Sequence, residues 1–245
     1  MQGEGCGSIA ERAPGSLVLE RLRSTLKPDW REYVVLVAEK LDGNPFAVLA
    51  AIILSQNTSD VNAIRAYERL RERLGRVTPE AVLGIPEEEL VELIRPAGLP
   101  RQKARAIREL AKRLLEEGGE RILVEKPWRE LRSWLLRVPG VGPKTADVFL
   151  SFYRGAPVFA VDTHALRIAK RWGLVGEKAG YDEASRALLE YLGPSDEAHR
   201  LLIALGRRYC TARSPRCGEC PLRDLCPYPR CHSSPKAGGG RRGEG

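Results

Sequence analysis

The chain has 245 residues, which is enough for one large domain or two small lobes with buried cores. Lysine and arginine outnumber aspartate and glutamate by 40 to 32, and the formal net charge of +8 favours a polyanionic partner. The first 16 residues lack the apolar stretch of a signal peptide, and the longest apolar run, 46–54, is too short to span a bilayer. We therefore expect a cytoplasmic protein without a membrane partner.

The middle of the chain predicts a succession of helices. From about residue 17 to 210, apolar residues recur at helical spacing, and Gly or Pro breaks the pattern into segments of roughly 10–18 residues. Only 158–161 is strand-like, and it is too short and solitary to build a sheet. The ends, 1–15 and 232–245, are Gly-rich and polar, so we expect disordered tails there. The pattern predicts an all-α protein.

Residues 135–146 show a helix-hairpin-helix pattern around two glycines. Gly140 and Gly142 allow a tight turn, and Pro143 suits the first position of a following helix. Glycines also let the backbone come close to a phosphate, and the free amides of a helix start make an anion site. A simple turn between two helices explains the glycines equally well, so the glycines alone leave both interpretations open.

Four cysteines lie close together near the C-terminus, in the pattern Cys-x6-Cys-x2-Cys-x5-Cys. They are Cys210, Cys217, Cys220 and Cys226. In a chain without an export signal such a group indicates metal binding rather than disulfides. Four thiolates suit zinc or a [4Fe–4S] cluster equally in ligand chemistry, and the uneven spacing only favours iron–sulfur slightly.

Two sequence motifs together resemble a known family. The sequence VPGVGPKTA at 138–146, followed by VDTH at 161–164, resembles the helix-hairpin-helix DNA glycosylases, specifically their endonuclease III branch, over roughly 17–230. This resemblance implies an all-α fold of two lobes and a [4Fe–4S] cluster on the four cysteines. Residues 38–156 would form a six-helix barrel with the helix-hairpin-helix at about 127–154, and residues 16–37 with 157–231 would form an iron–sulfur cluster lobe.

The resemblance also implies the chemistry. Lys144 stands at the position of the family's nucleophile and Asp162 at that of its catalytic carboxylate. An amine can attack the anomeric carbon, and a carboxylate stabilises the positive charge that builds on the sugar as the base leaves. The implied activity is a bifunctional DNA glycosylase and abasic-site lyase that removes oxidised pyrimidines and cleaves 3′ to the site. Asp162 is also expected to cap the helix that follows it.

The implied partner is double-stranded DNA with a damaged base or an abasic site, bound by a monomer. Residues expected to contact it are Gly140, Gly142, Thr145 and His164 around the hairpin, and Arg213 and Arg216 between the first two cysteines. A glycosylase must also take its target base out of the stack and fill the hole. Leu99 aligns with the family's apolar wedge. Two residues are candidates for the amide that fills the void. Gln56 has the side chain that the family uses, whereas Asn57 stands at the family's glutamine position when the alignment has no gap. Gln56 is slightly favoured.

Three other functions compete with this interpretation. Monofunctional adenine-mismatch glycosylases share the fold but usually carry Ser at the position of Lys144, and thymine–guanine mismatch glycosylases typically carry Tyr. A non-catalytic helix-hairpin-helix module would have no reason to keep both Lys144 and Asp162. Lys144 therefore argues against all three, and nicking of abasic-site DNA would discriminate between them.

Overall fold

The computed structural model describes residues 7–232, and every regular element within them is helical, as the sequence predicts. The α-helices are α1 (Gly15–Thr25), α2 (Val34–Leu41), α3 (Pro45–Leu54), α4 (Asp60–Leu74), α5 (Pro79–Leu83), α6 (Glu87–Leu93), α7 (Pro100–Glu117), α8 (Arg121–Glu125), α9 (Trp128–Leu135), α10 (Pro143–Phe152), α11 (Thr163–Arg171), α12 (Tyr181–Leu192), α13 (Asp196–Arg208) and α14 (Tyr228–His232). The short 3-10 helices are η1 (Ile9–Glu11), η2 (Trp30–Glu32), η3 (Arg95–Ala97) and η4 (Cys217–Glu219). Within this part of the chain, no helix has both the length and the apolar character that a membrane span requires.

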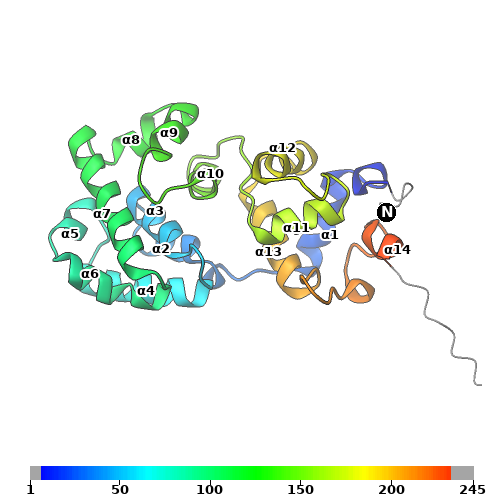
Figure 1. Cartoon of the computed structure of the whole chain (residues 1–245), viewed down its shortest axis with the longest axis horizontal. Coiled ribbons are helices and arrows are strands. Elements are labelled where there is room, and N and C mark those ends of the chain that lie inside the picture. The colour runs from blue at the N-terminus through cyan, green and yellow to red at the C-terminus, as the bar shows by residue number, and fades with distance from the viewer. Residues whose placement is uncertain (1–6, 233–245) are drawn as a thin grey trace, which may run out of the picture.

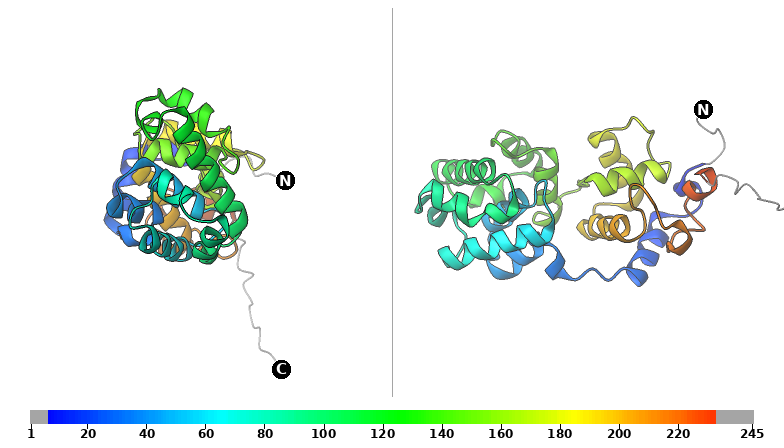
Figure 2. Two further views of the ribbon diagram at one scale, coloured as in Figure 1. Left: turned by 90° about the vertical axis from the view of Figure 1, so that its left-hand side faces the viewer. Right: turned by 60° about the horizontal axis from the view of Figure 1, so that its bottom comes forward.

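The helices form two lobes that lie side by side along the long axis of the molecule (Figures 1 and 2). The first lobe contains α2 through α10 around one buried apolar cluster. The second contains η1, α1 and α11–α13 around another, into which Leu222 and Leu225 of the cysteine segment pack. Helix α2 lies wholly in the first lobe, because Val34 and Val37 are buried in its core, although residue 37 was the expected boundary.

The first lobe divides into more helices than the resemblance implied. Nine helices, α2 through α10, lie within this described stretch where a barrel of six was expected. The three shortest of the nine account for the difference: α5 and α8 have five residues each, and α6 has seven. Gly84 ends α5, Pro86 precedes α6, and Gly118 ends α7 in the left-handed conformation. Glycine and proline therefore subdivide the lobe without changing its helical class.

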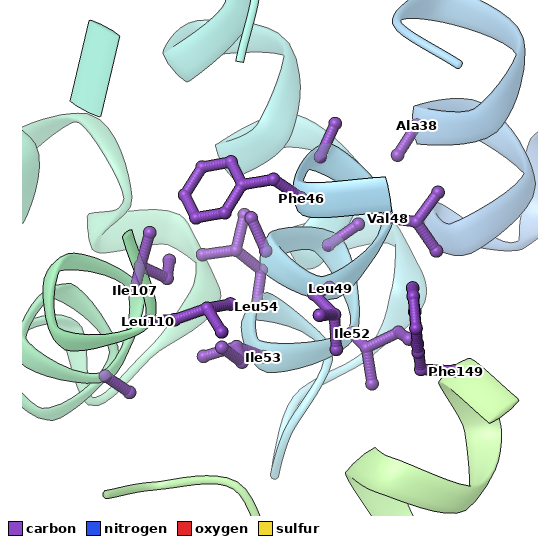
Figure 3. Packing of buried hydrophobic residues seen from close by; sticks show 14 of the residues in the cluster. Ala38, Phe46, Val48, Leu49, Ile52, Ile53, Leu54, Ile107, Leu110 and Phe149 are labelled. Carbon is purple, nitrogen blue, oxygen red and sulfur yellow. The ribbon is translucent and has the colours of Figure 1, made fainter. Parts of the chain in front are cut away.

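Helix α3 is the centre of the first lobe, and all ten of its residues are buried. A helix that is apolar around its whole circumference must be covered on every side. Figure 3 shows α3 lying between Ile107 and Leu110 of α7 and Phe149 of α10. The Asn44 side chain accepts a hydrogen bond from the amide of Ala47 at 2.7 Å and caps the helix start. The long apolar run in the sequence is thus the core helix of this lobe.

An extended segment, 156–161, carries the chain from the first lobe to the second. It forms no strand. Val158 and Ala160 are buried in the core of the first lobe, whereas Phe159 and Val161 are buried in that of the second. Alternate side chains of an extended backbone point in opposite directions, so four consecutive residues attach to both lobes. Asp162, which follows directly, is thereby placed where the two lobes meet.

The N-terminal segment 7–15 is ordered, contrary to the disorder expected for residues 1–15. Ile9 is fully buried in the second core, and its amide donates to the carbonyl of Trp172 at 2.8 Å. Gly15 approaches α12 so closely that a Cβ atom there would stand 1.9 Å from the carbonyl oxygen of Tyr191. Ile9 therefore anchors the segment together with Ala13, which is buried and whose carbonyl accepts a hydrogen bond from the Tyr191 hydroxyl at 2.9 Å. The rest of the expected tails, 1–6 and 233–245, lies outside the described residues.

Candidate active site and cysteine loop

The predicted hairpin is formed by α9 and α10. Gly140 has φ of +85°, and a Cβ atom there would lie 2.7 Å from the Cβ of Ala106 on α7, so both conformation and space require glycine. Gly142 precedes α10 as its N-cap residue, and Pro143 occupies the first turn. A Cβ atom at Gly142 would meet nothing within 4 Å. The protein itself does not require glycine at this position, so the open space in front of the helix start can admit a ligand's anionic group.

A cavity of about 740 Å³ lies at the junction of the two lobes, and both predicted catalytic residues line it. Lys144 belongs to the first turn of α10 and is exposed, and its amine has no hydrogen-bond or ion-pair partner among residues 7–232. Asp162 is half-buried at the start of α11. Its Oδ1 accepts a hydrogen bond from the amide of Ala165 at 2.7 Å, which confirms the predicted helix cap. The second carboxylate oxygen makes no hydrogen bond to the described residues.

Two polar bridges join the lobes beside this cavity. On α10, Asp147 is buried and receives two hydrogen bonds from Arg132 of α9, at 2.6 and 3.0 Å. The hydroxyl of Tyr181, from α12 of the second lobe, donates to the same carboxylate at 2.8 Å. Separately, Arg207 of α13 pairs with Asp60 of α4 at 2.7 Å. Since α10 carries Lys144 one turn before Asp147, the first bridge ties the hairpin to the lobe that carries the catalytic carboxylate.

His199 lines the same cavity and was missed in the sequence. It lies on α13, is only 7% exposed, and its Nε2 has no hydrogen-bond partner within the described chain. Burial lowers its pKa to about 4, against an opposing effect of Asp162, so the ring is neutral at pH 7. No motif marks this histidine, because its proximity to Lys144 and Asp162 arises only when α13 packs against α11.

His164, predicted near the DNA, is half-buried against α13. Its Nδ1 lies 2.9 Å from a guanidinium nitrogen of Arg167. A Cβ atom at Gly206 of α13 would come within 2.4 Å of the same ring nitrogen, so only glycine lets the imidazole pack there. Desolvation lowers the pKa of His164. The residue still lines the cavity, so packing and a ligand contact are compatible at this position.

The structure separates the two candidates for the void-filling amide. The Gln56 side chain turns toward the hairpin, where its Nε2 donates to the carbonyl of Gly140 and to the hydroxyl of Thr145, both at 2.9 Å. Asn57 is exposed, lines the cavity and has φ of 52°. Thr145, expected to contact DNA, is 4% exposed. The Thr145 hydroxyl therefore holds Gln56 inside the protein and is not positioned to reach a phosphate.

Leu99 lies outside this cavity, on an exposed loop of the first lobe. It is 50% exposed and directly precedes α7, with φ of 50° in the left-handed region. Exposed leucine in a strained backbone conformation is unfavourable in a protein that has nothing to bind there. The exposure fits the wedge role implied by the resemblance.

The four cysteines face one small cavity after α13. Cys210, Cys217, Cys220 and Cys226 are all partly buried and line a space of about 20 Å³. Burial raises the pKa of the Cys220 thiol to about 11 and that of Cys226 to about 12, so these sulfurs become thiolates only beside positive charge. No three Cys, His, Asp or Glu side chains of residues 7–232 are grouped to hold a single metal ion. Four sulfurs spread around a shared space fit a cluster whose irons stand between them.

Arg171, on α11, connects this loop to the rest of the lobe and was not anticipated. Its guanidinium donates to Sγ of Cys210 at 3.2 Å and to the carbonyls of Thr211 and Ala212 at 2.7 and 2.9 Å. The helix that begins at the Asp162 cap therefore ends in contact with the cysteine loop.

The two arginines predicted to face DNA differ in their surroundings. Arg216 donates a hydrogen bond to the carbonyl of Arg208 and lies over the ring of Tyr209, so its side chain holds the loop. Arg213 is exposed, and no hydrogen bond or ion pair engages its guanidinium within the described residues. Of these two arginines, only Arg213 has a guanidinium that is free for a phosphate.

The chain matches two family models. Residues 50–194 match the HhH-GPD superfamily of base excision DNA repair proteins. Residues 210–226, which begin and end at the outer cysteines, match the iron–sulfur binding domain of endonuclease III. The second match resolves the choice between zinc and iron–sulfur that the spacing of the cysteines left open.

Several characterised proteins are similar over most of the chain. Endonuclease III of Sulfolobus acidocaldarius is 34% identical over 210 residues, which cover 85% of this chain and 93% of that protein. Endonuclease III of Bacillus subtilis is 38% identical over 190 residues, with 77% and 83% covered. Among solved structures, an endonuclease III in a non-covalent complex with DNA has a TM-score of 0.71 at 32% identity, covering 88% of this chain and 94% of its own. A trapped covalent endonuclease III–DNA intermediate has a TM-score of 0.66 at 32% identity, with 83% and 98% covered.

The helical fold, the hairpin and the cysteine loop thus occur together with matches over nearly the full length of these relatives. The chain belongs to the endonuclease III family of base excision DNA repair proteins, and residues 210–226 are its iron–sulfur binding domain, the site of a [4Fe–4S] cluster.

Proposed function

We propose that this protein is a bifunctional DNA glycosylase and abasic-site lyase, which removes oxidised pyrimidines from double-stranded DNA and then cleaves the strand. The observation that carries the proposal is the shared cavity at the junction of the lobes, lined by an unpaired amine at Lys144 and a carboxylate at Asp162. The endonuclease III relatives, including structures with bound DNA, support the same activity.

The two side chains divide the chemistry. The Lys144 amine bonds to C1′ of the sugar as the bond from C1′ to the base breaks and the base leaves with the bonding electrons. Asp162 stabilises the positive charge on the sugar and accepts the proton that the amine gives up. The C1′–O4′ bond of the sugar then breaks, and the proton held by Asp162 passes to O4′. The opened sugar is left as a Schiff base between Lys144 and C1′, which acidifies the C2′ hydrogen. Loss of that proton forms a C2′–C3′ double bond and expels the 3′ phosphate oxygen, so the strand breaks 3′ to the lesion.

The surroundings of the pair support this division. One carboxylate oxygen of Asp162 accepts the hydrogen bond from the Ala165 amide, and the other is free to interact with the substrate. Neutral His199 contributes an unpaired, buried Nε2 to the cavity, and the nucleoside or an ordered water can satisfy it. Lys144, on the bridged hairpin, is held relative to Asp162 by the contact between Asp147 and Tyr181. A fixed separation of nucleophile and carboxylate favours the attack.

DNA contacts follow from the charge and shape of the same face. The free amides at the start of α10, next to Gly142, suit a backbone phosphate, and the unengaged Arg213 suits another. In the stack, Leu99 acts as the apolar wedge. Asn57, rather than Gln56, fills the void opposite, because it faces the cavity while Gln56 is held by the hairpin.

The four cysteines of 210–226 hold the cluster, with Arg171 supporting Cys210. When bound, the cluster fixes the fold of this loop, and with it the position of Arg213 beside DNA. All residues of the proposed site come from one chain, in agreement with a monomer. An enzyme that repairs the chromosome works where the chromosome is, and we therefore propose a cytoplasmic location for this protein.

Borohydride trapping on abasic-site DNA tests the proposal directly. A Schiff base reduced by borohydride leaves the protein covalently attached to the DNA, and we expect wild-type protein to form this adduct and to nick the strand. Lys144→Ala should form none, while Lys178→Ala, at an exposed lysine, should behave as wild type. Trapping by Lys144→Ala at the wild-type rate would show that another amine is the nucleophile. On DNA that carries a damaged base, release of the base without any nick would instead identify a monofunctional glycosylase.

A further inference from the structure

Lys103 is a buried lysine for which the proposed chemistry has no use. It lies in the first turn of α7 and is only 3% exposed. Its Nζ donates to the carbonyl oxygen of Leu54 at 2.8 Å and to that of Ala97 at 2.7 Å. No carboxylate of the described residues pairs with it. Burial lowers the pKa of Lys103 to about 8, and a positive charge near a helix start is further disfavoured by the helix dipole.

The two carbonyls belong to segments that are far apart in the sequence. Leu54 is the last residue of α3, and Ala97 is the last residue of η3. Carbonyls at helix ends lack partners within the helix, so a buried ammonium between them satisfies both. Each of the two segments leads directly into an exposed loop: Leu54 is followed by the loop that carries Asn57, and Ala97 by the loop that carries Leu99.

These two loops share a second, independent feature. Asn57, with φ of 52°, and Leu99, with φ of 50°, are the only non-glycine residues of 7–232 that have positive φ. The left-handed conformation is strained for residues with a side chain and persists only where the surroundings hold it. Both strained residues are exposed, and both follow within three positions a carbonyl that the Lys103 ammonium binds.

We infer that Lys103 is a positioning residue that sets the two base-extruding loops relative to each other, so that Leu99 and Asn57 enter the DNA stack together. The inference rests on the proposed function, in which these two residues wedge the helix and fill the void. The Lys103 ammonium acts on the backbone from which each tip projects, and its side chain hydrogen-bonds to neither tip. The Lys103 backbone amide does reach Leu99, through a hydrogen bond to its carbonyl at 3.1 Å at the start of α7. Without it, the two tips lose their common anchor, while Lys144 and Asp162 keep their places in the cavity.

The test compares Lys103→Met, which keeps the volume but removes both hydrogen bonds, with Lys112→Met at an exposed lysine of the same helix. We expect Lys103→Met to excise thymine glycol from a duplex about ten- to a hundredfold more slowly, in line with the cost of misplacing a positioned group. Cleavage and borohydride trapping of an abasic site in single-stranded DNA should stay at the wild-type level, because a single strand needs no wedge or filler. Lys112→Met should match wild type on both substrates.

Two further measurements separate positioning from a general loss of structure. A 2-aminopurine opposite the lesion should brighten on binding of wild type and not of Lys103→Met, and Lys103→Arg should restore part of the signal. Equal losses on duplex and single strand would mean that the residue only supports the fold, and an unchanged duplex rate would also overturn the inference. A wild-type protein that excises thymine glycol but fails to nick abasic DNA would instead refute the lyase step of the proposed function and not this role, which concerns base extrusion.

Discussion

Helix α3 and the cysteine segment 210–226 represent opposite ways of stabilising a piece of chain. All ten residues of α3 are buried, whereas in the cysteine segment only Leu222 and Leu225 are. The first region is held mainly by apolar burial, at roughly 25 cal/mol per Å² removed from water, and polar contacts from Asn44 and Lys103 satisfy only its two ends. The second region has too little buried apolar surface to be held in this way. Its fold depends on the iron–sulfur cluster that its four cysteines hold and on the hydrogen bonds from Arg171.

The contrast extends to function. In the proposed function, the first lobe, built on α3, presents the nucleophile and both base-extruding loops, while the second, which includes the cluster, presents Asp162 and Arg213. A lobe with a complete apolar core can hold strained loops such as those at Asn57 and Leu99 without a cofactor. A segment whose fold depends on metal ligands, such as the cysteine segment, can instead hold a charged residue such as Arg213 on a surface that has no apolar core beneath it.

Cys217→Ser should have the largest effect of the variants that test this contrast between α3 and the cysteine segment. Loss of one thiolate should remove the cluster, seen as loss of bound iron and of visible absorbance, and should abolish hydrogen-exchange protection around 210–226. Amides of α3 should keep their protection, because their core contains no ligand. Loss of protection in both regions at once would show that the lobes fold as a single cooperative unit and that the contrast is wrong.

Leu49→Ala is the complementary variant, because it perturbs the apolar core of the first lobe and not the cluster. Leu49 lies in the centre of α3, and its side chain is fully buried. We expect a loss of about 2–5 kcal/mol in the free energy of unfolding, from lost burial and the cavity left behind. The iron content should not change. Iron loss in this variant would mean that the cluster loop depends on the first core.

Asp162→Asn should slow base excision by about 10²–10³-fold, because it removes the charge that stabilises the sugar cation. Asparagine can still accept the hydrogen bond from Ala165, so the cap, the stability and the DNA affinity should be nearly preserved. Single-turnover excision and DNA binding, measured on the same substrate, check this. Excision at the wild-type rate would exclude the assigned role of the carboxylate.

Asn57→Ala should reduce excision of a paired lesion by about tenfold, with little effect on abasic cleavage in single strands. Gln56→Ala should behave differently, because it removes two hydrogen bonds to the hairpin that carries Lys144. We expect it to slow both the excision of a paired lesion and the cleavage of an abasic site in single strands. The opposite result, with a selective loss for Gln56→Ala alone, would assign the void-filling role to glutamine after all.

Arg213→Ala is expected to have the smallest effect. Removing one phosphate contact should weaken binding by a few fold and reduce the slope of log K against log salt by about 0.9. Binding titrations of duplex DNA at several salt concentrations measure it. Arg216→Ala serves as the control, since its guanidinium is engaged by the backbone of Arg208, and its salt slope should match wild type.

Local patterns in the sequence predicted a large part of this protein. The helical periodicity, the glycines of the hairpin, the Asp162 cap and the cysteine spacing all depend on residues a few positions apart, so each can be read without a fold. The ordered segment 7–15 was missed because its anchor, Ile9, finds its partners across the chain near Trp172 and not beside itself.

What only the tertiary structure decided involves residues that are distant in sequence. Gln56 donates a hydrogen bond to Gly140, which is 84 positions away in the sequence, and Lys103 donates one to Leu54, which is 49 positions away. In each case packing between helices brings the acceptor to a polar side chain. His199 became a cavity residue in the same way. The sequence by itself determined the helices, the turns, the cysteine pattern and the catalytic motifs, because these depend on local spacing. Which amide faces the cavity, and which lysine holds the loops, was decided by packing between helices, because burial makes an unpaired polar group costly wherever the chain happens to place it.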